Sequence, residues 1–257
     1  MRRLFILVCC THLAAFAEVP PIQQWIDEAI AAGGGVVTIP EGEHVLHTGL
    51  VIKDAKKLAL RGMNKETCIL KLETGTNEPN QDWLIKVTGN GDTLEIANLT
   101  LDGGSDTQSR PSELIVIEAT DDPTSAPIKD VNVRDCLLQN YASAISVKNA
   151  IGCVIERCSF RDGGQRAISF LMHSKDCQAR GNQITRTTTA IYLYDAQSCL
   201  IEGNEMWECA QGIHIGQEQT TEKLAPHTLR NNGFFDTKQP LFISENSPAP
   251  LNEKSQE

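Results

Sequence analysis

Four phrases of the sequence decide the fold: Ala144–Val147 (AISV), Ala167–Phe170 (AISF), Ala190–Leu193 (AIYL) and Gly212–Ile215 (GIHI). They begin 23, 23 and 22 residues apart. A fixed period of this size is typical of one structural unit stacked on copies of itself. The sequence therefore predicts a solenoid, in which residues one period apart lie side by side.

The stretches between these phrases predict strands. A second phrase keeps the same period, at Cys153–Glu156, Cys177–Arg180 and Cys199–Glu202. Short apolar stretches are separated by Gly, Asn, Asp and Arg, and no helical periodicity interrupts them. Three strands per period predict an all-β, single-stranded parallel β-helix, in which each coil adds one strand to each of three sheets.

Side chains alternate between the two sides of a strand, so the repeated phrases also predict which residues face solvent. The isoleucine of each phrase and the apolar residue two positions later point inward. The residues beside them point outward. The predicted outward set is Ser146, Lys148, Ser169, Leu171, Tyr192, Tyr194 and His214.

The segment before the repeats predicts a capping helix over residues 22–32, which ends at Gly33–Gly35. An amphipathic helix at this place covers the free edge of the stacked strands, which would otherwise invite aggregation. Its apolar face consists of Ile22, Trp25, Ile26, Ala29 and Ile30. We expect one β-helix domain over residues 18–244 and a disordered tail over residues 245–257.

The first residues predict export. Arg2 and Arg3 precede an apolar run, and Ala15–Ala17 is a small-x-small cleavage pattern. This arrangement is typical of a secretory signal peptide, here residues 1–17. The apolar run is shorter than the ~20 residues that a spanning helix needs. We therefore expect a secreted or periplasmic protein.

The net negative charge of the chain limits the classes of molecule that it can bind. The formal net charge is −10, and loss of Arg2 and Arg3 with the signal peptide makes it −12. Such a surface repels nucleic acid and anionic membranes, because both need clustered Lys and Arg. An acidic polysaccharide can still bind through a local basic patch or a bridging cation. We expect a polysaccharide partner, no nucleic acid, no membrane, and a monomer.

The cysteines and asparagines follow the repeat. Cys153, Cys177 and Cys199 share one repeat position, while Cys136 and Cys158 share another. They predict internal stacks of free thiols. The alternative is disulfides between neighbouring coils, since strands ~4.8 Å apart satisfy disulfide geometry. The second position passes from cysteine to Asn182, Asn204 and Asn232, which predicts amides stacked inside a turn. No pattern predicts a structural metal site.

Further phrases resemble a known family. The helix with Gly33–Gly42 (GGGVVTIPEG), Leu58–Gly62 (LALRG) and Asn98–Gly103 (NLTLDG) resemble the N-terminal part of the pectin lyase-like superfamily. The resemblance covers residues 22–243 and implies a right-handed β-helix. It does not choose a reaction, because the superfamily includes lyases, hydrolases, epimerases, phage tailspikes and non-catalytic modules. Of the four motifs of its polygalacturonases, two are missing, one has an echo at Gly212–Gly216 (GIHIG), and the Asp-Asp pair, Asp121–Asp122, lies in a predicted loop and not at a strand end.

The resemblance implies that sugars bind along the outer face of one sheet, and the sheet that carries the repeated phrases is our candidate. Tyr192 and Tyr194 suit stacking on sugar rings. A lyase that acts on a uronate must neutralise the carboxylate, remove a proton and protonate the leaving oxygen. We predict Lys148 and Arg166 for the first task and His214 or a tyrosine for proton transfer. Solvation of an ordinary strand face is the alternative.

Acidic residues gather around one coil, before and after the predicted strand that holds Leu114–Glu118. We assign Asp102 and Glu118 to substrate binding. The cluster also fits Ca²⁺ binding or an acid–base pair for hydrolysis, and acids in loops commonly just face water. Ca²⁺ is thus the one cofactor considered, and none is required by the sequence. The cluster comprises Asp102, Asp106, Glu113, Glu118, Asp121 and Asp122.

These observations support three hypotheses of function. The first is a secreted carbohydrate-active protein that cleaves an acidic, uronate-containing glycan by β-elimination. The second is a non-catalytic β-helix module that binds glycan or protein. The third is a glycoside hydrolase. Whether the protein is an enzyme stays open at this point, with lysis favoured over hydrolysis.

Overall fold

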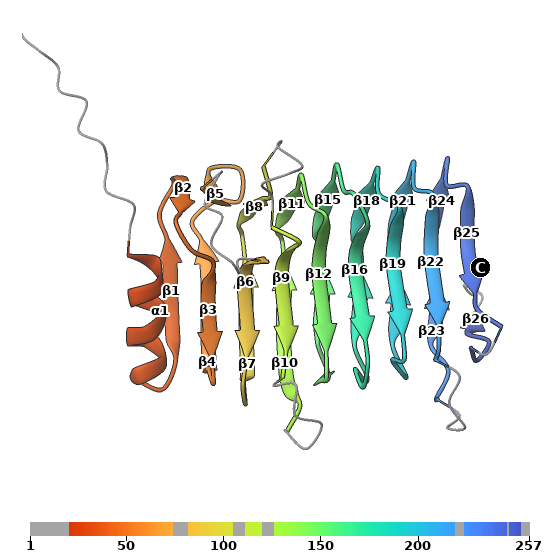
Figure 1. The fold of residues 1–257 in the computed structure, drawn as a ribbon, viewed down its shortest axis with the longest axis horizontal. Coiled ribbons are helices and arrows are strands. Elements are labelled where there is room, and N and C mark those ends of the chain that lie inside the picture. Colours follow the sequence, from red (N-terminus) through yellow and green to blue (C-terminus); the bar gives the residue numbers. More distant parts are fainter. Residues whose placement is uncertain are drawn as a thin grey trace, which may run out of the picture.

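A computed structural model describes residues 21–73, 82–104, 111–119, 126–218, 224–245 and 247–252. In this part of the chain, nearly all regular structure is parallel β-strand, and the single helix lies at the N-terminal end. The chain forms a right-handed parallel β-helix, as the repeat and the resemblance predicted (Figure 1). The predicted signal peptide lies outside the described residues.

Three parallel sheets run the length of the solenoid. Sheet A contains β1 (Gly35–Ile39), β4 (Lys56–Gly62), β7 (Asp92–Ala97), β10 (Ile128–Arg134), β13 (Ala150–Ile151), β14 (Val154–Glu156), β17 (Gln178–Arg180), β20 (Leu200–Glu202), β23 (Thr228–Arg230) and β26 (Leu251–Asn252). Sheet B contains β2 (Gly42–Leu46), β5 (Cys68–Leu72), β8 (Thr100–Asp102), β11 (Leu137–Gln139), β15 (Ser159–Arg161), β18 (Gln183–Thr185), β21 (Glu205–Trp207) and β24 (Gly233–Phe235). Sheet C contains β3 (Leu50–Lys53), β6 (Trp83–Thr88), β9 (Glu113–Glu118), β12 (Ser143–Lys148), β16 (Arg166–Leu171), β19 (Thr189–Tyr194), β22 (Gln211–Gly216) and β25 (Gln239–Ile243).

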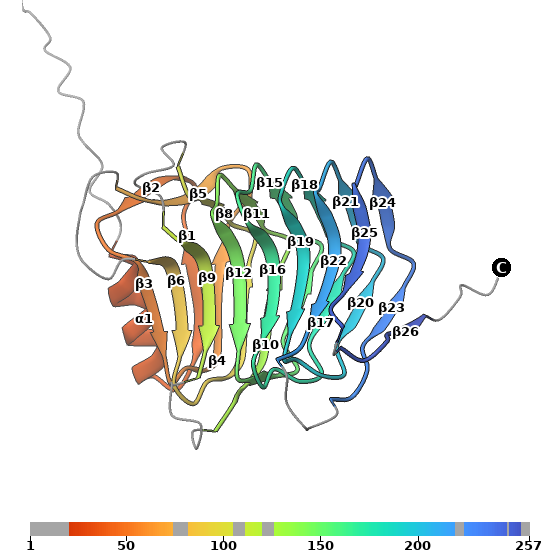
Figure 2. The ribbon, with the colours of Figure 1, turned by 45° about the vertical axis from the view of Figure 1, so that its right-hand side comes forward.

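The predicted register is confirmed in sheet C, whose strands lie side by side in Figure 2. Ile145, Ile168, Ile191 and Ile213 are partners on successive strands. All four are buried, with the apolar residues two positions later. One continuous apolar core therefore fills the inside of the coils and holds the outward residues in straight rows.

The turn from sheet A to sheet B explains why the repeat carries Asn, Asp and Gly. From the turn after β7 onward, one residue per coil there has a positive φ, and the residue after it is buried except in the last coil, where Asn232 is partly buried. Asn, Asp and Gly adopt this left-handed conformation at the lowest cost. The positive-φ residues of this column are Asn98, Asp135, Arg157, Gly181, Gly203 and Asn231.

Helix α1 (Ile22–Ala31) packs against the first coil, at the end opposite β25 and β26 (Figure 1). Ile22 and Ile26 are buried in the core. The Gln23 amide donates to the carbonyl of Val51 on the edge strand β3 and accepts from its N–H. The helix thus covers both the apolar end and part of the hydrogen-bonding edge.

The predicted asparagine column is present in the turn. The Asn182 side-chain oxygen accepts from the Cys158 N–H at 3.0 Å, and Asn204 accepts from the Asn182 N–H at 3.0 Å. Asn232 accepts from the Asn204 N–H at 3.1 Å. Each amide also donates to a backbone carbonyl of the preceding coil. These residues are structural, because they satisfy backbone groups buried between coils.

The seven described cysteines are free and buried. Hydrogen bonds to Cys177 and burial raise the pKa of the Cys153 and Cys199 thiols well above the usual value. Such thiols stay protonated and behave as small apolar side chains.

At the C-terminal end, the segment predicted to be a disordered tail contains β26, which pairs with β23.

Candidate functional site

The candidate site is the outward surface of β9, β12, β16, β19, β22 and β25, which we call the sheet C face. Its central row follows the register Ser146, Ser169, Tyr192, His214 and Phe242. The face therefore changes along the solenoid axis, from short polar side chains to a file of rings. The predicted residues Glu118, Lys148, Arg166, Tyr192, Tyr194 and His214 all belong to strands of this sheet.

The rings of the face contact one another across three coils. The centroids of Tyr192 and His214 are 4.8 Å apart with their planes at 77°, and those of His214 and Phe242 are 4.5 Å apart at 89°. Tyr192 and Tyr194 stack at 5.8 Å. These contacts orient the rings before any ligand binds, which reduces the side-chain entropy lost on binding.

Arg166 is held beside this file of rings. Its guanidinium lies over the Tyr192 ring, 4.1 Å from the centroid. Within the described ranges, no ion pair or side-chain hydrogen bond engages this guanidinium. A planar cation that stacks on a ring while its N–H groups stay unused suits two-point recognition of a carboxylate.

Lys148 is arranged differently. Its ammonium pairs with the Glu118 carboxylate on the neighbouring strand at 3.3 Å. The Glu118 side chain is 18% exposed, whereas that of Lys148 is 36% exposed. The pair neutralises itself, so Lys148 is a weaker candidate than Arg166 for holding a substrate carboxylate.

Two serines of the central row are more buried than an outward position predicts. Ser146 is 3% exposed and Ser169 is 1% exposed. Ser146 donates a short hydrogen bond to Glu113, so the longer glutamate covers it. Ser169 Oγ has no hydrogen-bond partner among the described residues. A buried hydroxyl without a partner is uncommon, and this one lies between Ser146 and Tyr192 in the row.

Asp102 is not part of this face. It ends β8 in sheet B, where its carboxylate accepts from Gly104 N–H, Gln139 Nε2 and Asn140 Nδ2 at 2.8–2.9 Å. These contacts close a turn. Asp106, Asp121 and Asp122 of the predicted acidic cluster lie outside the described residues.

Burial and the Arg166 cation shift the pKa values of the two side chains predicted for proton transfer, His214 and Tyr192. Burial lowers the pKa of His214, and the Arg166 cation lowers it further. His214 is therefore neutral at neutral pH and can accept a proton. Burial raises the pKa of Tyr192, although Arg166 acts in the opposite direction. Tyr192 therefore keeps its proton and can donate it.

Phe242 and Ser244 were not predicted as part of the site. Phe242 is the register partner of His214, and Ser244 Oγ lies 3.5 Å from His214 Nε2. The distance between His214 and Phe242 in the sequence is longer than the usual period because residues 217–226 are inserted between them. Restarting the repeat after this insertion would have revealed Phe242.

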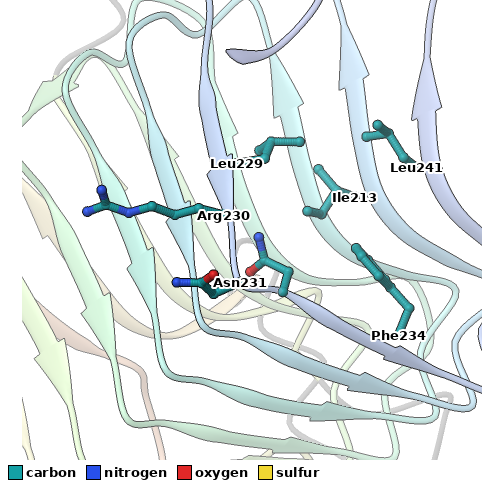
Figure 3. A pocket seen from close by; sticks show the side chains of 7 residues that line it. Ile213, Leu229, Arg230, Asn231, Phe234 and Leu241 are labelled. Atoms are coloured by element: carbon teal, nitrogen blue, oxygen red, sulfur yellow. The ribbon is translucent and has the colours of Figure 1, made fainter. Parts of the chain in front are cut away.

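A cavity of about 280 Å³ at the C-terminal end is a second possible location, shown in Figure 3. The buried Ile213 and the partly buried Phe234 and Leu241 form its apolar side, while the Arg230 guanidinium points away from them (Figure 3). Arg230 pairs with Glu202 at 2.8 Å. This cavity offers apolar volume but no pair of proton-transfer groups.

Fold and face together define a right-handed parallel β-helix with a row of aromatic rings beside Arg166, the one cation of the described face that has no carboxylate partner. The profile of the family described as "Periplasmic copper-binding protein (NosD)" matches residues 85–247. The chain belongs to this family. No curated protein sequence matches the chain. No helix in the described ranges has both the length and the apolar character to cross a membrane.

Solved structures share the fold at low identity. The catalytic unit of a GH87 α-1,3-glucanase from Streptomyces thermodiastaticus is 17% identical, with a TM-score of 0.66, over 91% of this chain and 49% of that one. The DFA-IIIase of Arthrobacter chlorophenolicus without its lid, in complex with GF2, is 14% identical, with a TM-score of 0.65, over 82% of this chain and 66% of that one. Gene product 12 of bacteriophage phi29 is 13% identical, with a TM-score of 0.59, over 80% of this chain and 34% of that one. This chain thus spans less than two thirds of each.

The copper in the family description requires a test against the residues. Across the described ranges, no group of three or more His, Cys, Asp or Glu is arranged to hold a metal ion. Three cysteines and one histidine, Cys153, Cys177, Cys199 and His227, form a buried column. In it, His227 Nδ1 already accepts from the Cys199 N–H at 3.2 Å and the Cys199 thiol donates to a carbonyl. A column with these groups engaged does not fit a metal centre, so no step below uses copper.

Proposed function

We propose that this protein is an exported carbohydrate-active β-helix that binds an acidic glycan on the sheet C face and cleaves it by β-elimination. The observation that carries the proposal is the guanidinium of Arg166, which has no ion-pair partner among the described residues and lies against Tyr192, with His214 as the next ring in the row. A cation, a neutral base and a protonated acid are the three groups that elimination from a uronate requires.

Each group has one task. Arg166 binds the carboxylate and stabilises the negative charge that develops when the neighbouring C5 proton is removed. His214 takes that proton, and the electron pair of the C5–H bond forms a double bond between C4 and C5. The C4–O bond breaks, and Tyr192 gives its proton to the departing oxygen. The products are a shortened chain and an unsaturated uronate.

Hydrolysis by two carboxylates is less compatible with this face. Glu113 and Glu118, the acids on its described strands, are the first and last residues of β9. At ~3.3 Å per residue they are about 16 Å apart, beyond the ~5 to 9.5 Å that glycoside hydrolysis needs. Glu113 is also engaged by Ser146 and Glu118 by Lys148.

The comparisons support the general part of the proposal. The family is described as periplasmic, in agreement with the signal peptide expected from residues 1–17. One neighbour in fold is a glucanase, so the fold supports catalysis on a polysaccharide in that protein. The reaction assigned here depends on the side chains of the sheet C face alone.

The test is incubation of the mature protein with uronate polysaccharides, with and without Ca²⁺. We expect ultraviolet absorbance from the conjugated double bond to grow together with new reducing ends. Reducing ends without absorbance would replace elimination by hydrolysis. Binding without either product would leave the aromatic file as the surface of a non-catalytic glycan-binding module, which is the second candidate function.

A further inference from the structure

The distribution of charge along the sheet C face says which acidic glycan it can hold. Strands β19, β22 and β25, on the C-terminal side of Arg166, contain no Lys, Arg, Asp or Glu. The polar and aromatic side chains that they expose are rings and amides, whereas Thr189 is buried at 5% exposure. A sugar chain laid along the solenoid axis meets a new strand every ~4.8 Å, close to the length of one sugar ring. After Arg166 it therefore meets no Lys, Arg, Asp or Glu on these three strands.

The outward residues of these strands are suited to uncharged sugars. Thr189 and Gln211 occupy the same row as Arg166, one and two coils further on. Thr189 Oγ donates to Gln211 Oε1 at 3.1 Å, and Gln211 Nε2 donates to Gln239 at 3.2 Å. This chain of neutral groups borders the rings of Tyr192, His214 and Phe242, so hydroxyl groups and ring faces both find partners.

On the N-terminal side of Arg166 a second carboxylate would meet acids. Strand β12 carries Lys148, which Glu118 already neutralises, and β9 carries Glu113 and Glu118. Like charges in contact cost binding free energy. In the described part of this face, from β9 to β25, Arg166 is thus the one cation without a carboxylate partner.

We infer that the ligand is a mixed glycan, in which the uronate at Arg166 is flanked by uncharged sugars, and not a homopolymer of uronates. The inference rests on the proposed function and names its substrate class. A homopolymer would carry a carboxylate on each sugar. Most of these carboxylates would lose hydration on binding without forming an ion pair in return. With one sugar per strand, an alternating polymer places a neutral sugar over Tyr192, next to Arg166, and halves the number of carboxylates that meet strands without a cation.

The test compares two unsulfated polymers of similar length with the mature protein. One alternates a uronate with an N-acetylhexosamine, and the other contains uronates alone. Calorimetry measures binding, and ultraviolet absorbance measures elimination in parallel. We expect the alternating polymer to bind about tenfold more tightly or better. Equal or tighter binding of the homopolymer, or no binding of either, overturns the inference.

The two readouts separate this inference from the proposed reaction. Preference for the alternating polymer without absorbance supports the mixed ligand and rejects elimination. Absorbance from the homopolymer without that preference supports elimination and rejects the mixed ligand.

A pair of charge variants tests the cause. Gln211→Lys adds a cation two coils from Arg166 and is expected to improve binding of the homopolymer up to about fivefold, the range of an exposed ion pair. Gln183→Lys is the matched control, because Gln183 is exposed on a strand of sheet B. The control should leave binding unchanged. Equal gains from both variants would show a non-specific effect of net charge and overturn the inference.

Discussion

The outer faces of sheets A and C use the same strand spacing in opposite ways. On sheet A, Arg134, Glu156, Arg180, Glu202 and Arg230 occupy one row on five successive coils, so the sign of the charge alternates. Arg180 pairs with Glu156 at 3.0 Å, and Arg230 pairs with Glu202 at 2.8 Å. On sheet C, Arg166 has register partners Ser143 and Thr189, and neither carries a charge.

The difference shows that the register partners of an arginine decide whether its charge stabilises the fold or is available for a ligand. Elsewhere on sheet A, burial alone would raise the pKa of Glu95, but hydrogen bonds from Arg61 and Arg134 lower it. The charged side chains of sheet A form ion pairs with their neighbours and help to hold the coils in register. A cation whose neighbours above and below are neutral keeps its N–H groups for a ligand.

The largest effect is expected from His214→Phe. The phenyl ring preserves the contacts with Tyr192 and Phe242 but cannot accept a proton. Elimination should fall by about 10²- to 10⁴-fold, the usual contribution of a general base, while glycan binding stays close to that of the wild type. Steady-state absorbance assays and calorimetry measure the two. Wild-type turnover in this variant would remove His214 from the mechanism.

The second-largest effect is expected when Arg166 on sheet C is substituted, with the same substitution of Arg180 on sheet A as the comparison. Arg166→Gln should lower kcat/KM by about 10²- to 10³-fold, because the charge that develops on the substrate loses its stabilising cation. Arg180→Gln removes an equal charge from sheet A and should leave kcat/KM unchanged. If both substitutions reduce turnover alike, net charge rather than the position of Arg166 governs the reaction.

For the free energy of unfolding, we expect a substitution on sheet A to have a larger effect than the equivalent substitution on sheet C. Glu156 pairs with Arg157 and Arg180, both at 3.0 Å, and its side chain is 14% exposed. Glu156→Gln should lower the free energy of unfolding by about 1.5 kcal/mol. Glu118→Gln on sheet C loses one pair, at 3.3 Å to Lys148, and should cost about 1 kcal/mol or less. Urea unfolding at low and high salt measures both values, and a larger loss for Glu118→Gln would contradict the comparison.

The smallest effect is a pKa shift that needs no substrate. Burial and Arg166 both lower the pKa of His214, so removing the cation should raise that pKa toward the ordinary histidine value. The native imidazole would then become protonated at a higher pH in Arg166→Gln than in the wild type. An NMR titration of the imidazole C–H signals follows this directly. Arg180→Gln provides the control and should leave the His214 titration where it is.

The repeat predicted most of the fold. Because inward side chains of a solenoid must be apolar at each coil, the spacing of Ile145, Ile168, Ile191 and Ile213 identified sheet C and its register. The capping helix could be predicted for a similar reason, since its apolar face has no other surface to cover. The column of Asn182, Asn204 and Asn232 followed from the need to satisfy backbone groups in each turn.

The structure brings some of the predicted site residues together and separates others. Strand alternation predicted that Tyr192, Tyr194 and His214 face outward. Asp102 was grouped with Glu118 because acidic residues gather around one predicted coil, but Asp102 lies on sheet B and Glu118 on sheet C. Proximity in the sequence does not give proximity in space across a corner of the solenoid.

The sequence by itself determined the rows, because hydrophobic burial repeats with the period of the chain and acts through local spacing. Only the tertiary structure decided which charges within those rows are paired. Whether Lys148 reaches Glu118, and whether Arg166 lies over Tyr192, depends on the rotamers of long side chains and on contacts across coils. That pairing distinguishes an arginine that holds two coils together from one that can hold a carboxylate.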